Sequence, residues 1–116
     1  MKLVFAAVAM LSLLMSSAAA ELKVLTGEEI EKLLPQIVAV GDQTRQTFSA
    51  AGGTTYTDRG RDSFGTWRVQ DAQYCSLWPP SADWSCFQVI YDAEAAILIW
   101  VGETGHRLQN RVELKD

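Results

Sequence analysis

Apolar and polar residues alternate along most of the chain after Pro35, which is the pattern of strands that bury one face. The alternating runs are rich in β-branched and aromatic residues, and turn-forming pairs such as Gly52-Gly53 separate them. Short strands with regular turns favour an antiparallel meander that curls into a barrel or half-barrel. We therefore expect seven or eight strands, drawn from residues 36–40, 43–50, 54–57, 61–69, 72–77, 84–92, 96–101 and 106–114.

A single helix is expected before the first of these strands. Thr26 and Glu29 have the spacing of a capping box, in which each side chain accepts a hydrogen bond from the other residue's backbone N–H. Pro35 should end the helix after about two turns by forcing Leu34 out of helical geometry. A helix this short is not stable alone, so it must dock on the sheet. The expected fold is mainly β (α+β): a short N-terminal helix packed on a strongly curved antiparallel sheet or a small up-and-down barrel.

The first twenty residues have the order of a secretory signal peptide. A basic start at Lys2 precedes the apolar run Leu3–Met15, and the small residues Ser16–Ala20 form a signal-peptidase site. The alternative is a short membrane anchor, which the length of the apolar run disfavours. Residues 1–20 are therefore expected to be removed, and residues 21–116 to form one β-rich domain that is periplasmic or secreted and has no stable membrane insertion.

The charge balance narrows the choice of partners. Removal of Lys2 would leave nine basic residues against fourteen acidic ones, a formal net charge of −5 in place of the −4 of the full chain. Phosphate neutralisation dominates binding to nucleic acid, so a chain this acidic makes nucleic acid an unexpected partner.

Cys75 and Cys86 are the two cysteines, and an even count in an exported protein favours a disulfide over free thiols. If the two cysteines face each other between neighbouring strands, Tyr74 lies opposite Phe87. The Tyr74 face is then the core face, and the cysteine face is expected to be more exposed. The run Ala96–Val101 is apolar in both phases, which predicts a strand covered on both faces.

The sequence offers little for catalysis. His106 is the single histidine, and no serine after residue 20 lies in a Gly-x-Ser-x-Gly elbow, so a nucleophile–base pair is not indicated. Acidic residues such as Asp58, Asp62, Asp92 and Glu94 flank turns, where they have a local structural use. The prediction is a non-enzymatic protein without a cofactor or a metal site.

Two features are candidate binding sites. Tyr74, Trp78 and Trp84 crowd around the predicted disulfide loop, where rigid aromatic surface would suit a ligand or a protein contact. The alternative is that these tryptophans pack over the disulfide and plug one end of the barrel. Arg59 and Arg61, between two aspartates, could grip an acidic group, or they could form the solvated tip of a hairpin.

Two resemblances accompany these patterns. Residues Gly65-Thr66-Trp67-Arg68 resemble the Gly-x-Trp strand of calycin-type barrels, the lipocalins and the bacterial lipocalin-like protease inhibitors. The region after residue 20 also resembles a group of small exported bacterial proteins of unassigned function. The motifs behind that second resemblance are Leu25–Gly27, Thr55-Tyr56, Gly65–Val69, Tyr74–Trp78, Cys86 and Gly105–Arg107.

The resulting functional expectation is a binding module for a small or apolar ligand, or for the surface of an exported protein. Inhibition of an exported enzyme, which the calycin resemblance implies, is the alternative, and an enzyme is the third class.

Overall fold

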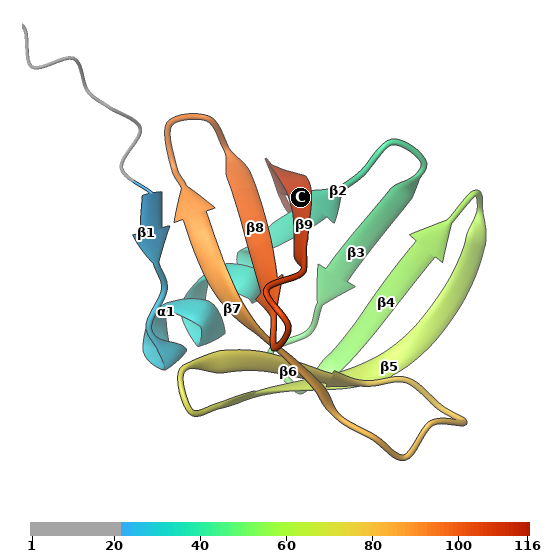
Figure 1. The fold of residues 1–116 in the computed structure, drawn as a ribbon. Coiled ribbons are helices and arrows are strands. Elements are labelled where there is room, and N and C mark those ends of the chain that lie inside the picture. Colours follow the sequence, from blue (N-terminus) through green and yellow to red (C-terminus); the bar gives the residue numbers. More distant parts are fainter. Residues whose placement is uncertain (1–21) are drawn as a thin grey trace, which may run out of the picture.

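The computed structural model describes residues 22–116, so the predicted signal peptide lies outside the described residues. Eight antiparallel strands form a closed up-and-down barrel (Figure 1). Each strand pairs with the next one along the chain, and pairing of the first barrel strand with the last closes the barrel. The barrel strands are β2 (Ile37–Val40), β3 (Thr44–Phe48), β4 (Gly53–Asp58), β5 (Arg61–Gln70), β6 (Gln73–Leu77), β7 (Ser85–Asp92), β8 (Ile97–Gly102) and β9 (Arg107–Leu114).

All eight expected strands are present, with ends that differ from the expected ends by at most two residues. A ninth strand, β1 (Leu22–Val24), was not predicted from the sequence. It pairs with Ile90–Asp92, the last three residues of β7, beyond the segment Ser85–Phe87 that pairs with β6. Three residues carry no strand pattern of their own, so this strand depends on the free edge that the longer β7 provides.

The helix α1 (Gly27–Leu33) begins as expected, with both hydrogen bonds of the capping box between Thr26 and Glu29. Hydrogen bonds from Lys23 and from the Thr26 backbone also lower the pKa of Glu29. The expectation for Leu34 is wrong, because this residue keeps helical angles (φ −58°, ψ −40°) and starts the 3-10 turn η1 (Leu34–Gln36). Pro35 fits near the start of a helical turn, where its missing N–H has no partner to lose.

Helix α1 closes one end of the barrel (left in Figure 1). Ile30 and Leu34 are fully buried in the same apolar core as the strand residues. The start of the helix touches the β5–β6 turn so closely that a Cβ on Gly27 would lie 2.9 Å from Val69 Cγ1. The barrel therefore has a closed end at α1 and an opposite end formed by the β2–β3, β4–β5, β6–β7 and β8–β9 connections.

Four aromatic rings form the centre of the core. Phe48 is fully buried, and its ring lies 5.9 Å from that of Trp67, 5.6 Å from that of Tyr74 and 6.0 Å from that of Trp100, centre to centre. Two of these contacts are edge-to-face, an arrangement that the aromatic quadrupole favours.

The expectation that the strand at Ala96–Val101 is covered on both faces is wrong, because β8 is buried on one face only. Leu98 and Trp100 point into the barrel and are buried, whereas Ile97, Ile99 and Val101 lie half-exposed on the outer face. In a small barrel the second face of every strand meets solvent unless another element covers it. Within residues 22–116, no helix is long and apolar enough to cross a membrane.

Candidate functional site: a cavity at the open end of the barrel

A cavity of about 510 Å³ lies in the barrel at the end opposite α1 and opens to solvent. Seven of the eight barrel strands, or the residues next to them, contribute to its walls. The lining residues are Ala39, Gly41, Thr44, Gln46, Tyr56, Tyr74, Ser76, Trp78, Phe87, Trp100, Leu108, Gln109 and Asn110.

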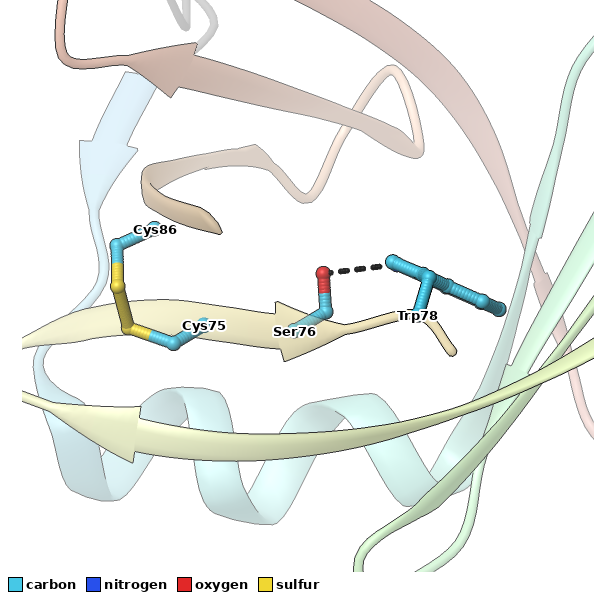
Figure 2. Close-up of a disulfide and its surroundings, with 4 residues drawn as sticks. All are labelled: Cys75, Ser76, Trp78 and Cys86. Atoms are coloured by element: carbon cyan, nitrogen blue, oxygen red, sulfur yellow. Dashed lines mark hydrogen bonds between the residues drawn. A yellow bond between two sulfur atoms is a disulfide. The ribbon is translucent and has the colours of Figure 1, made fainter. Parts of the chain in front are cut away.

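One side of the cavity is aromatic. This aromatic wall consists of Tyr74 and Trp78 on and next to β6, Phe87 on β7 and Trp100 on β8. The Trp78 indole N–H donates to Ser76 Oγ at 3.1 Å, which holds the ring against β6 (Figure 2). Tyr56 of β4 meets the Trp78 ring edge-on, with the ring centres 6.3 Å apart. Both flat faces and ring edges are thus available to a ligand.

The Trp78 ring occupies space that is free only because Gly65 has no side chain. A Cβ built on Gly65 would lie 2.7 Å from both Leu77 O and Trp78 Cε3, closer than such atoms approach in proteins. One of these atoms is backbone, so the clash is not relieved by a rotamer change alone. Gly65 therefore sets the position of Trp78 at the mouth of the cavity.

We expect Gly65→Ala to lower the free energy of unfolding by about 1–3 kcal/mol, the usual cost of forcing atoms into a packed site. The matched control is Gly53→Ala on the neighbouring strand, where the nearest atom to the new Cβ is Ser49 Cβ at 3.9 Å. Urea denaturation of both variants measures the difference. Equal stability of the two variants would show that Trp78 does not depend on Gly65.

The opposite side of the cavity carries two side-chain amides. This amide wall consists of Gln46 of β3 and Asn110 of β9, with the small residues Ala39 and Gly41 between them on and after β2. β2 and β6 are four strands apart in a closed barrel of eight, so the amide wall faces the aromatic wall.

Both amides are held by hydrogen bonds to the barrel. Asn110 Oδ1 accepts from the Trp100 indole N–H at 2.8 Å. Gln46 Nε2 donates to Thr54 Oγ1 at 3.0 Å and to the Tyr74 hydroxyl at 3.1 Å. Burial raises the pKa of Tyr74, although hydrogen bonds from Ser76, Gln46 and Thr54 oppose the shift. The phenol at the base of the cavity therefore stays neutral at ordinary pH.

The Cys75–Cys86 disulfide joins β6 to β7 near the mouth (Figure 2). The two cysteines are direct partners in the ladder, and Tyr74 pairs with Phe87, as the sequence predicts. The expectation of a more exposed cysteine face fails for Cys75, which is completely buried on the outside of the barrel. The disulfide fixes the two strands from which the β6–β7 loop leaves.

The predicted binding residues separate into three places. Tyr74 and Trp78 line the cavity. Trp84 lies outside the barrel, where the Arg68 guanidinium stacks 3.9 Å above its ring centre. Arg59 and Arg61 are exposed at the β4–β5 turn, and the Arg59 Nε–H donates to Gln43 Oε1 of the adjacent turn. Neither arginine lines the cavity.

Sequence reasoning missed Tyr56, Gln46 and Asn110 as site residues. The sequence does hold a signal for the two amides, because each is a polar residue in the inward phase of its strand. Gln46 is two residues before the buried Phe48 on β3, and Asn110 alternates with Leu108 and Val112 on β9. Inward polar residues in a small barrel mark either a hydrogen-bonded network or a wet cavity.

Among residues 22–116, the side chains that could bind a metal ion do not gather into a site. No group of three or more metal-ligating side chains comes together within that range. His106 is exposed at the β8–β9 turn, and Asp92 Oδ1 accepts from the backbone N–H of Ala95 in its own turn. The chain matches no family model, no curated protein and no solved structure.

Proposed function

We propose that this protein is a non-enzymatic binding module that takes a small, largely apolar ligand into the mouth of its barrel. The observation that carries the proposal is the cavity of about 510 Å³, open at one end, whose mostly apolar lining includes five aromatic side chains. Pockets for small molecules in proteins have volumes of roughly 300–1,000 Å³ and the same kind of lining, apolar with a few placed polar groups.

The surroundings of the cavity support a preformed site. The disulfide, the aromatic core and the indole hydrogen bonds of Trp78 and Trp100 hold its walls in the absence of a ligand. Helix α1 closes the far end, so a ligand would enter and leave by one mouth. Little ordering is then needed on binding, which favours affinity.

The proposed location is the periplasm or the extracellular space. The signal-like residues 1–20 and a disulfide in a small domain both support export, because disulfides persist in oxidising compartments. A lipocalin-like relationship is proposed on the Gly65–Trp67 motif and the up-and-down barrel together.

The test is a titration of the purified protein with N-phenyl-1-naphthylamine, a neutral dye that fluoresces when it leaves water. We expect saturable binding to one site. Trp78→Ala should weaken binding by about tenfold or more, because a large stacking surface is lost. Trp84→Ala is the matched control, since its ring lies outside the barrel, and it should bind the dye as the unchanged protein does.

Absence of saturable fluorescence would contradict the proposal. Equal loss of binding in the two tryptophan variants would also contradict it, because the site would then not be the cavity.

A second candidate, inhibition of an exported enzyme, is favoured by the exposed β6–β7 loop. Its central residues, Pro79 to Asp83, are exposed beside the disulfide and project from the barrel (Figure 1). Replacing this loop by a short glycine–serine linker should then abolish inhibition of the target enzyme. An intact inhibitory effect after the replacement would exclude this loop as the inhibitory element.

A further inference from the structure

We infer that the ligand is an uncharged ring compound whose edge carries both a hydrogen-bond donor and an acceptor, in the manner of a carboxamide or lactam. The inference rests on the proposed function and names the chemical class that the same cavity fits. It follows from the charge of the lining, from the fixed orientation of the two amides, and from the wall that faces them.

The residues that line the cavity disfavour a charged ligand. None of the residues that form the cavity is acidic, basic or histidine. An ionised group moved from water into such a site would lose its hydration without gaining an opposite charge, which costs several kcal/mol or more. Arg59 and Arg61, the residues that the sequence suggested for gripping an acidic group, lie on the β4–β5 turn and do not line the cavity. The ligand class is therefore neutral.

The orientation of Asn110 is set by chemistry. The Trp100 indole N–H can only donate, so the Asn110 atom that it meets must be the carbonyl oxygen. The Nδ2 amino group is the remaining end of this side chain. Among the described residues no acceptor is hydrogen-bonded to it, and no buried side-chain polar atom lacks a partner, so Nδ2 is accessible. Asn110 offers the cavity a donor.

In Gln46 the amide nitrogen is held by hydrogen bonds and the oxygen is left free, the reverse of Asn110. Thr54 has one hydroxyl proton, and it is donated to the Thr47 carbonyl at 2.8 Å. Thr54 Oγ1 must therefore accept from Gln46, which fixes Nε2 on that side. The same nitrogen also donates to Tyr74, so the Oε1 end remains for the cavity. Gln46 offers an acceptor.

The two amides project into one space. β3 and β9 are the two neighbours of β2, so their backbones lie roughly 10 Å apart, and both side chains point inward. A ligand that only accepts would leave Gln46 Oε1 dehydrated and unpaired, and a ligand that only donates would do the same to Asn110. Each unpaired buried group costs about 1–3 kcal/mol. A carboxamide satisfies both.

The opposite wall selects the rest of the ligand. Tyr74, Trp78, Phe87 and Trp100 offer ring faces and edges, on which a flat ring packs better than a flexible chain. The complete ligand is thus a ring against the aromatic wall with its polar edge toward Gln46 and Asn110.

Displacement of bound N-phenyl-1-naphthylamine by four matched naphthalenes tests the inference. The probes are 2-naphthamide, 2-acetylnaphthalene (acceptor only), 2-ethylnaphthalene (no polar edge) and the anion 2-naphthoate. We expect 2-naphthamide to compete best, by about fivefold or more over the ketone and the hydrocarbon, since one buried hydrogen bond is worth about that factor. The anion should compete least.

Asn110→Asp separates the role of the donor from that of the fold. The aspartate keeps an oxygen for the Trp100 indole and replaces the cavity-facing NH₂ by a carboxylate oxygen. The ketone 2-acetylnaphthalene, whose carbonyl accepts from Asn110 Nδ2, should lose its advantage over 2-ethylnaphthalene, because the variant has no donor at this position. Gln88→Glu is the control, because it makes the same change of charge at an exposed position outside the cavity, and it should keep that advantage.

The outcomes are distinguishable. If the dye binds and the unchanged protein does not prefer 2-naphthamide, the ligand class is overturned while the proposed function stands. An advantage of 2-acetylnaphthalene over 2-ethylnaphthalene that survives in Asn110→Asp also overturns it. If neither the dye nor any naphthalene binds, the proposed function itself fails.

Discussion

Phe48→Ala is expected to lower the free energy of unfolding by about 3–5 kcal/mol, the range for removing a buried aromatic ring. Phe48 has no exposed surface and touches three of the large rings of the core, those of Trp67, Tyr74 and Trp100. These rings come from three different strands, so no single side chain can close the gap that the substitution leaves. Denaturation in guanidinium, followed by circular dichroism, measures the loss.

Phe64→Ala is the matched control for this substitution. Phe64 lies on the outer face of β5 with 69% of its surface exposed. The same change should alter stability there by less than about 0.5 kcal/mol, as is usual for surface positions. If the two variants unfold at the same denaturant concentration, the ring cluster around Phe48 is not the centre of the core.

Cys75→Ala combined with Cys86→Ala is expected to cost about 3 kcal/mol, which is the effect of losing a cross-link over a short loop. The cysteines are 11 residues apart and join neighbouring strands at the base of the β6–β7 loop. The added freedom belongs mainly to the unfolded chain. A domain of this size has a total stability of about 5–15 kcal/mol, so the effect is large.

Denaturation with and without reductant measures the contribution of the disulfide. The unchanged protein should lose stability in reductant, and the double-alanine variant should be insensitive to it, because no disulfide remains to be reduced. A double variant as stable as the oxidised protein would show that the disulfide has no stabilising role.

Most of the fold follows from the sequence because its signals are local. Alternation of apolar residues, turn pairs and the capping box of Thr26 and Glu29 are each read within a few residues. The pairing of Cys75 with Cys86 also fixes the register of β6 and β7. Closure of the barrel is different, since it depends on β2 pairing with β9, some 70 residues later in the chain, and no local pattern encodes it.

The site was only partly predictable. Trp78 and Trp84 flank one loop in the sequence, yet Trp78 lines the inside of the barrel and Trp84 lies on its outside. The predicted register distinguishes the two. Trp78 is four residues after the inward Tyr74 and therefore also faces inward. Ser85 pairs with the inward Ser76, so its neighbour Trp84 faces outward. The inward phase of Gln46 and Asn110 indicates either an internal hydrogen bond or a wet cavity, and only the placement of the surrounding strands decides between the two.

A small neutral ligand in the cavity should alter the surroundings of the indole N–H groups that line it, and the signals of the four tryptophans test this most directly. In a ¹H–¹⁵N spectrum recorded with N-phenyl-1-naphthylamine, the signals of Trp78 and Trp100, which line the cavity, should shift in proportion to the bound fraction. Those of Trp67, bonded to Ser49 O at the closed end, and of Trp84, outside the barrel, should stay in place. Shifts confined to Trp84, or spread evenly over all four signals, would contradict the account.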